Sequence, residues 1–296
     1  MLLGVPNFSE GRDLSLIDRI ADRFASGAEL LDRHSDPAHN RTVLTLRAPP
    51  HVLGEALARG AEACRITIDM RRHEGAHPRI GALDVCPVVW LHPEDRDIAR
   101  DEAFTVATAI AAAGIPVFLY GDLASEEPRR ERAFFRDGGI DRLRERMASG
   151  EVTPDLGPPQ LHPSAGGTLV TARPPLAAFN VFLGGGDVGA ARAIAARLRE
   201  SGAGLPGVRA IGVELGEGRI QVSTNVHDPI SIPLAEVLGR IRELAADRGT
   251  AVASTEIVGL VPEAAMRDWP TEVPIEGFDP DRHVIERRLS DAGWRP

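Results

Sequence analysis

The order of strand-like and helix-like segments repeats along the chain, and this repeat limits the folds that the sequence can adopt. In the first ninety residues, short runs of leucine and β-branched residues alternate with apolar residues at helical spacing, in the order βαββαβ. Residues 177–258 show the same order, which is typical of the split βαβ, or ferredoxin-like, unit. We therefore predict an α/β (α+β) fold of two ferredoxin-like βαββαβ subdomains, whose sheets face each other across a cleft with the helices outside.

A segment rich in proline and glycine separates the two repeats. Residues 151–167 follow neither helical nor strand spacing, and such long loops are uncommon in compact domains unless they are functional or disordered. The sequence Arg173-Pro174-Pro175 follows soon after. We place the boundary there, which predicts subdomains at residues 1–172 and 173–296.

The composition argues against several classes of function. The net charge is −9, whereas a nucleic-acid-binding protein generally presents a basic face. All 34 basic residues are arginine, so the chain has neither a phosphate-loop lysine nor a Schiff-base lysine. No apolar run approaches the length of a membrane span. We expect small-molecule substrates, with neither nucleic acid nor membrane as a partner.

Two further features favour the cytoplasm. The start Met1-Leu2-Leu3 lacks the charged region of a signal peptide. The chain has only 2 cysteines, as expected in a reducing compartment.

Residues 68–87 are the stretch richest in candidate catalytic side chains. A helical pattern ends near the start of this stretch, and a valine-rich strand pattern begins near its end. Pro78 lacks an N–H and pushes the residues before it away from helical geometry, and nearby glycines allow a tight connection. We therefore predict that His73, His77 and Arg79 lie on a loop between two packed elements, where catalytic groups are often placed.

Other chemistries are less compatible with these residues. His73 and His77 have the spacing of a helical metal-binding pair, with Asp84 as a possible third ligand, but a glycine and a proline interrupt the required helix, so we expect no metal. Cys86 lies in an apolar run and is predicted to be core. Asp187, after three glycines, is better interpreted as a helix N-cap than as part of a phosphate site. His77 remains as an acid/base group near pH 7.

Several longer motifs occur in a characteristic order. The first part of the chain contains Val5-Pro6-Asn7-Phe8-Ser9-Glu10-Gly11, Leu30-Leu31-Asp32, His39-Asn40-Arg41-Thr42-Val43 and the stretch 68–87. The later part contains Pro154-Asp155-Leu156-Gly157-Pro158, Ala177-Ala178-Phe179-Asn180-Val181 and Gln221-Val222-Ser223-Thr224-Asn225. In these motifs the sequence resembles the formiminotransferase family over about its whole length. It resembles the transferase portion alone, without the cyclodeaminase of the bifunctional animal enzyme.

The resemblance implies a function and its reactants. The family's glutamate formimidoyltransferase activity moves the formimino group of N-formimino-L-glutamate to N5 of tetrahydrofolate, a co-substrate, with no metal or redox cofactor. It also implies that folate binds between the facing subdomains and that the protein is a homodimer. The family's catalytic histidine, in its His-Pro-Arg motif, corresponds to His77. Its folate-contacting loop corresponds to Gln160, Leu161, His162, Pro163, Ser164, Ala165, Gly166, Gly167, Thr168 and Leu169.

Three positions depart from the family pattern. His34 stands where relatives usually have an aspartate of an Asp-Val-Asp sequence. Ala165 replaces the tryptophan of the animal folate loop, and Thr171 lies in the segment that usually reads Gly-Ala-Arg. The first two substitutions remove a carboxylate and an apolar contact that the resemblance places near the active site.

A single histidine can carry the proton transfers of this reaction, because its unperturbed pKa lies near the working pH. We assign this shuttle to His77. We expect substrate contacts, or support for them, from Asn7, Asn40, Arg41, Arg79 and Asp84. The roles of three of these stay open: Asp84 either orients the imidazole or caps local structure, and Arg41 and Arg79 either bind carboxylates or form surface salt bridges.

Two alternative functions also remain open. One is a protein that binds reduced folates without transferring a group, which the histidine at position 34 favours. The other is a glutamate formyltransferase that uses 5-formyltetrahydrofolate, since both donors carry a small planar group on the same nitrogen.

Overall fold

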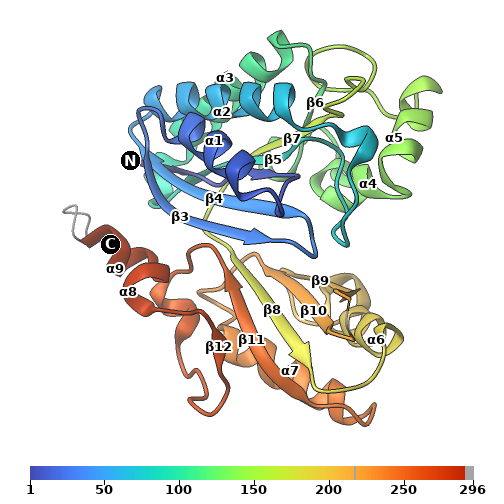
Figure 1. Cartoon of the computed structure of the whole chain (residues 1–296). Coiled ribbons are helices and arrows are strands. Elements are labelled where there is room, and N and C mark those ends of the chain that lie inside the picture. Colours follow the sequence, from blue (N-terminus) through green and yellow to red (C-terminus); the bar gives the residue numbers. More distant parts are fainter. Residues whose placement is uncertain (217, 291–296) are drawn as a thin grey trace. The chain divides into compact units, whose positions relative to one another are not determined.

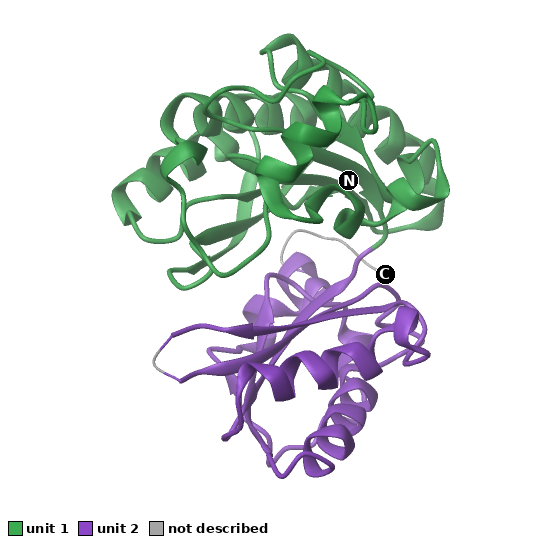
Figure 2. Ribbon diagram, turned by 90° about the vertical axis from the view of Figure 1, so that its right-hand side faces the viewer, with its two compact units in different colours: residues 1–174 green, residues 175–296 purple. Residues whose placement is uncertain are grey.

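The computed structural model describes residues 1–216 and 218–290, and the chain divides into two compact units. Unit 1 is Met1–Pro174 and unit 2 is Pro175–Pro296 (Figure 2). Each unit has its own sheet and its own hydrophobic core. In the described part of the chain, no helix combines the length and apolar character that crossing a membrane requires.

Unit 1 contains a seven-stranded sheet. Its strands are β1 (Leu2–Gly4), β2 (Asn7–Phe8), β3 (Glu29–Asp36), β4 (Arg41–Ala48), β5 (Leu83–Trp90), β6 (Val117–Leu119) and β7 (Thr168–Arg173). β1 and β2 both pair with β4 and β5, so they act as two halves of one strand that is interrupted at Pro6. The antiparallel order β3, β4, β1/β2, β5 is the predicted ferredoxin-like unit. Parallel strands β7 and β6 extend the sheet beyond β5.

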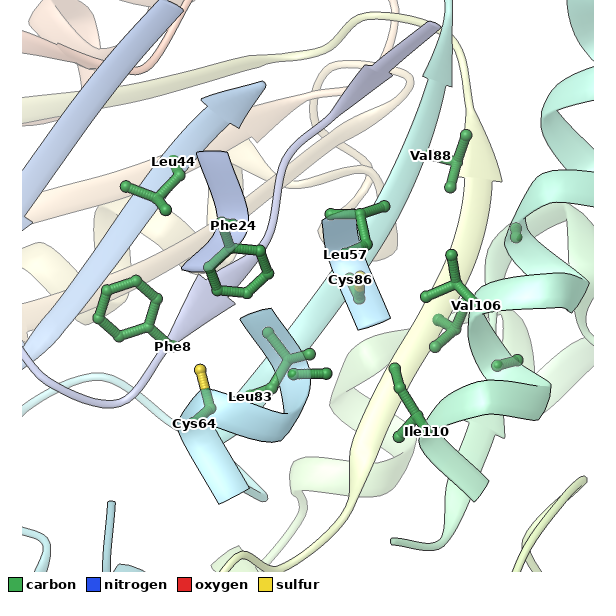
Figure 3. Close-up of a cluster of buried hydrophobic side chains, with 14 of the residues drawn as sticks. Phe8, Phe24, Leu44, Leu57, Cys64, Leu83, Cys86, Val88, Val106 and Ile110 are labelled. Atoms are coloured by element: carbon green, nitrogen blue, oxygen red, sulfur yellow. The ribbon is translucent and has the colours of Figure 1, made fainter. Parts of the chain in front are cut away.

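Three long helices cover one face of this sheet: α1 (Leu14–Ala25), α2 (Val52–Thr67) and α3 (Arg96–Ala112) (Figure 1). α1 begins where the Asp13 carboxylate accepts the Leu16 N–H (3.0 Å), as expected of an N-cap. Their apolar sides meet alternate residues of the strands in one core (Figure 3). Cys64 and Cys86 both lie in it, which confirms the prediction for Cys86. Burial raises the pKa of Cys86 to about 12, so it stays protonated.

The other face of the sheet is covered near β5, β6 and β7 by two short helices, α4 (Arg132–Arg136) and α5 (Gly139–Ala148). Phe135 and Leu143 from these helices pack with Val85, Phe118 and Leu169. The charged segment 126–146 therefore forms short helices that are anchored by a buried apolar side.

Unit 2 repeats the ferredoxin-like order. Its elements are β8 (Ala177–Leu183), α6 (Val188–Leu198), β9 (Val208–Glu214), β10 (Ile220–Val226), α7 (Leu234–Ala246), β11 (Val252–Val258), β12 (Ile275–Glu276), α8 (Pro280–His283) and α9 (Ile285–Ser290). The strand order is β12, β11, β8, β10, β9, with antiparallel pairing except between β11 and β12. Asp187 caps α6 through the Ala190 N–H (2.8 Å), as predicted. The two βαββαβ units expected from the sequence are confirmed.

Candidate active site

The loop that carries His77 is held against the turn before β4. The Ala76 N–H donates to the carbonyl of Ala38 (3.1 Å), and Asn40 Nδ2 donates to the carbonyl of Glu74 (2.9 Å). A Cβ at Gly75 would lie 2.3 Å from the His39 carbonyl oxygen, so only glycine permits this approach. The predicted loop is thus irregular but tied down by its backbone.

Arg79 stabilises the same loop through hydrogen bonds to its backbone. Its guanidinium donates to the carbonyls of His73 (2.8 Å), Gly75 (2.8 Å) and His77 (3.0 Å). These bonds hold the backbone on either side of the histidine. We therefore assign Arg79 to positioning the loop rather than to gripping a substrate carboxylate.

The turn that joins β3 to β4 is partly buried, although it carries polar residues. His39, Asn40 and Arg41 are all less than a tenth exposed. Asn40 adopts a left-handed backbone (φ 49°), and its Oδ1 accepts the Gly11 N–H (2.9 Å). Most of the polar atoms buried here have hydrogen-bond partners, although Nε2 of His39 has none among the described residues. Asn40 therefore supports the site by joining three segments of the chain.

A β-bulge in β5 turns Asp84 toward the functional residues. Asn7 pairs with Val85 and Phe8 with Leu83, which leaves Asp84 as the extra residue. Its carboxylate is fully buried. One oxygen accepts the N–H of Ile80 (2.8 Å). A regular strand would direct this side chain to the opposite face, among the core helices.

Two arginines meet the other oxygen of Asp84. Arg41 Nη1 lies 2.6 Å from Oδ2, and Arg136 Nη2 contacts the same atom. Asn7 Oδ1 accepts from the Arg41 Nε (3.2 Å) and Nη2 (2.7 Å). Burial raises the pKa of Asp84, but the charges of Arg136 and Arg41 and the Ile80 N–H outweigh it and hold the pKa below its usual range. The carboxylate is therefore ionised between two fixed cations.

Arg136 is a site residue that sequence reasoning missed. It lies on α4, in a segment dense in charged residues, and nothing in its local pattern sets it apart from its neighbours. Burial, partly offset by Asp84, lowers its pKa to about 10, so it remains charged at neutral pH. Its position depends on the packing of Phe135 beneath the sheet.

The hydrogen bonds of His77 define its tautomer. Nδ1 lies 2.7 Å from the carbonyl oxygen of Pro78, which can only accept, so Nδ1 carries the proton and Nε2 has a free lone pair. Burial, the charges of Arg41 and Arg136, and His39 lower the pKa of His77 well below its ordinary value. Arg41 Nη1 approaches to 3.4 Å of Nδ1. The imidazole is therefore a neutral base at physiological pH.

Asp84 does not contact His77 directly. Of the two roles left open for Asp84, its hydrogen bonds favour the structural one, since they fix Arg41 next to the imidazole. His39 lies closer, with its ring 5.6 Å from that of His77 and tilted by 73°. The Asp36 carboxylate pairs with His39 Nδ1 (3.1 Å). This second histidine was also missed, because in sequence it is one more polar residue of a turn.

The segment Gln160–Leu169 packs against the end of the His77 loop. The Ala82 N–H donates to Ala165 (2.8 Å), and the Gly167 N–H donates to Ile80 (3.0 Å). A Cβ at Gly81 would lie 1.9 Å from the Gly167 oxygen, so the two backbones touch. The structure thus brings the two predicted functional segments together.

The side chains of this segment divide into two groups. The inward group is buried and holds the backbone: Leu161, Ala165, Thr168 and Leu169. The last two already belong to β7 rather than to a loop. The side chains that remain accessible are those of Gln160, His162, Pro163 and Ser164. His162 Nδ1 accepts the Ala165 N–H (3.0 Å) and shapes the turn.

Within residues 1–216 and 218–290, no three His, Cys, Asp or Glu side chains gather closely enough to hold a metal ion. The site that the structure supports is therefore built from a neutral histidine, a buried carboxylate and arginines.

Comparison with known proteins places these residues in a family context. Residues 1–173 match the N-terminal subdomain of the formiminotransferase domain, and residues 178–270 match a second formiminotransferase domain model. The chain is 36% identical to a glutamate formimidoyltransferase of Streptococcus pyogenes serotype M1 over 294 residues, covering 96% of this chain and 97% of that protein. It is 34% identical to a glutamate formimidoyltransferase of Thermoplasma acidophilum, covering 97% of each. A formimidoyltransferase-cyclodeaminase of Sus scrofa is 39% identical over 278 residues, which are 89% of this chain and 50% of that relative. The chain belongs to the formiminotransferase family.

Proposed function

We propose that the chain is a glutamate formimidoyltransferase, which moves the formimino group of N-formimino-L-glutamate to N5 of tetrahydrofolate and releases glutamate. Relatives with this name match it over nearly their full length. The single structural observation that carries the proposal is the neutral His77 with a free Nε2 beside fixed guanidinium groups. That is the state a base needs in order to accept a proton from an attacking amine.

His77 acts as a shuttle in this proposal. As N5 of tetrahydrofolate attacks the formimino carbon, a C–N bond forms and Nε2 takes the proton of the attacking nitrogen. The resulting imidazolium then gives that proton to the departing glutamate nitrogen as the second C–N bond breaks. Because the pKa of His77 is lowered, its imidazolium form is a stronger acid than an unperturbed imidazolium and gives up the proton more readily.

Positioning supplies the rest of the rate acceleration. Holding two substrates in reactive geometry can contribute roughly 7–11 kcal/mol to lowering the barrier. We assign the folate contacts to the accessible side chains of the 160–169 segment, since its backbone abuts the His77 loop. Asn7 and Asn40 serve as supports, because their polar atoms are engaged within the protein. We further propose a cytoplasmic homodimer that needs no metal, in keeping with the family resemblance.

A direct assay tests the function. Purified protein is mixed with tetrahydrofolate and N-formimino-L-glutamate, and glutamate release is followed, with elemental analysis and a chelator arm run in parallel. A second reaction offers 5-formyltetrahydrofolate and glutamate. We expect turnover with the formimino donor, unchanged by the chelator. Turnover with the formyl donor alone would establish the formyltransferase instead, and tight folate binding without either reaction would establish the non-catalytic alternative.

A further inference from the structure

Four arginine side chains form a cluster in unit 1, and two of them contact the Asp84 carboxylate. They are Arg41, Arg132, Arg136 and Arg173. Arg132 and Arg136 lie one turn apart on α4, and Arg136 shares Asp84 Oδ2 with Arg41. In keeping with this arrangement, the charge of Arg132 lowers the pKa of each of the other three. Among the described residues, their ion pairs involve Asp84 alone. The cluster therefore carries excess positive charge.

Tyr120 links the outer members of the cluster. The guanidinium carbon of Arg132 lies 5.9 Å from the centre of the Tyr120 ring. The Tyr120 backbone is fixed to β7, where its N–H donates to Val170 (3.1 Å) and its carbonyl accepts from the Thr171 hydroxyl (2.7 Å). Arg173 follows two residues later on the same strand and so points to the same face as Thr171.

Other arginines that lie over aromatic rings show what is unusual about Arg132. In the described part of the chain, each of the others also pairs with a carboxylate: Arg96 with Asp122, Arg129 with Asp155, Arg146 with Glu151 and Arg219 with Glu276. Arg132 forms no hydrogen bond or ion pair with any described residue. An arginine held on a ring without an acid has its donors available for a ligand.

Arg173 and Arg136 also have guanidinium N–H groups that no described residue accepts. Arg173 is half-buried and hydrogen-bonds only the carbonyl of Pro174 (2.9 Å) among the described residues. Burial lowers its pKa to about 10, so it remains charged with no carboxylate to compensate. Arg136 donates from Nη2 to Asp84, but its buried Nε has no partner in the part of the chain that the structure describes. Unsatisfied guanidinium groups of this kind match the planar, two-oxygen geometry of a carboxylate.

We propose that Arg132, Arg136 and Arg173 form a carboxylate-binding subsite, which Arg136 connects through Asp84 to Arg41 and so to His77. The identity of its occupant rests on the proposed function: the carboxylate belongs to the glutamate part of the amino-acid substrate or to the glutamate tail of the folate. In either case the subsite binds the charged end of a reactant, and the reacting group of the same molecule lies at His77. Arg79, whose two terminal nitrogens both donate to carbonyls of the loop, plays no part in it.

The test compares Arg132→Gln and Arg173→Gln with a matched arginine. Arg130→Gln removes the same charge from a side chain that is already paired with Asp122 (3.3 Å) and serves as the control. Calorimetry measures the Kd of L-glutamate, of tetrahydrofolate and of tetrahydropteroate, which lacks the glutamate tail. Steady-state kinetics measure the KM for N-formimino-L-glutamate. Thermal unfolding shows that the variants are folded, and Arg132→Lys keeps the charge but not the forked geometry.

We expect Arg132→Gln and Arg173→Gln each to raise one Kd by about tenfold to a hundredfold, the usual worth of charged hydrogen bonds, with Arg132→Lys between. If the Kd of L-glutamate and the KM for N-formimino-L-glutamate rise, the subsite binds the amino-acid substrate. If the Kd of tetrahydrofolate rises but that of tetrahydropteroate does not, the subsite binds the glutamate tail of the folate. Binding that changes no more than in Arg130→Gln would overturn the subsite. Calorimetry measures binding without turnover. If the wild-type protein has no transferase activity, but the arginine variants bind glutamate or folate more weakly than it does, the subsite is supported and only the proposed function is wrong.

Discussion

The two units share one framework and differ in what they bury. In unit 1, the strand equivalent to β8 is broken at Pro6, and β5 carries a bulge that delivers Asp84 to the site. In unit 2, β8 pairs with β10 through seven consecutive residue pairs, and the irregularity in β11 falls at Ala253, which has no polar side chain. The candidate site lies where unit 1 departs from regular pairing. The regularly paired strands form a rigid sheet, and the break at Pro6 and the bulge in β5 position the residues of the candidate site.

The buried polar groups of the two units are also of different kinds. Unit 1 buries ions, with Asp84 between Arg41 and Arg136. Unit 2 buries neutral groups, such as Thr224, whose hydroxyl donates to Phe179 (2.6 Å). Removing one member of a buried ion pair leaves an uncompensated charge, whereas removing a neutral hydrogen bond leaves a smaller penalty. The comparison therefore predicts a graded series of effects.

The largest effect is expected from His77→Ala. Loss of a positioned acid/base should lower kcat by about 10²–10⁴, while the affinity for tetrahydrofolate changes little because the 160–169 segment remains. His73→Ala is the control, since His73 lies on the same loop and its Nε2 contacts the Asn40 carbonyl (3.0 Å). Steady-state kinetics and folate titration measure both. A collapse of folate binding with unchanged turnover of the bound complex would make His77 a ligand contact.

Next in size is Asp84→Asn, which leaves Arg41 and Arg136 without their counter-charge. Breaking a buried pair in this way costs about 3–5 kcal/mol of stability. The matched change in unit 2 is Thr255→Val, which removes the hydrogen bond from a fully buried hydroxyl to the Pro274 carbonyl (3.0 Å in the wild type) and should cost about 1 kcal/mol. Urea denaturation at pH 7 compares the two. Equal losses would show that burial of ions does not distinguish the units.

Asp36 should make unit 1 sensitive to acid. Burial raises its pKa, but the hydrogen bonds and charge of His39 lower it from 3.8 to about 2. Because the folded pKa is depressed, the stabilisation is present above the unfolded value and is lost as the pH falls from about 4 to 2. It amounts to about 2 kcal/mol. Asp36→Asn should therefore be less stable at pH 7 and have a shallower loss over this window. Parallel curves for variant and wild type would contradict this.

The smallest effect is expected in unit 2 and has the opposite sign. Gln221 on β10 is fully buried, and neither Oε1 nor Nε2 of its amide has a partner among residues 1–216 and 218–290. Gln221→Met should stabilise the protein by about 1 kcal/mol, because an unsatisfied amide is replaced by an apolar chain of similar size. Thr224→Val on the same strand should destabilise it by a similar amount. Thermal unfolding checks both. A loss of stability in Gln221→Met would reveal a bound partner at that amide.

Much of the fold could be predicted from the chain because its signals are local. Apolar spacing and β-branched runs mark the strands and helices of both units, and Asp187 marks the start of α6. The position of His77 on an irregular loop followed from Pro78 and its neighbouring glycines. What local patterns do not contain is the extension of the first sheet, since β7 pairs with β5 across about eighty intervening residues.

The sequence by itself determined the two βαββαβ repeats, the candidate loop and the family, because periodicity, backbone-restricted residues and motifs are properties of neighbouring positions. Only the tertiary structure decided how the charges meet. Arg136 and Asp84 are separated by 52 residues, and a β-bulge and the packing of α4 bring them together. The same assembly lowers the pKa of His77, since burial and the charges of Arg41 and Arg136 come from segments that are distant along the chain. A charged side chain has the same appearance in the sequence whether it is solvated or buried, so its environment is settled by folding.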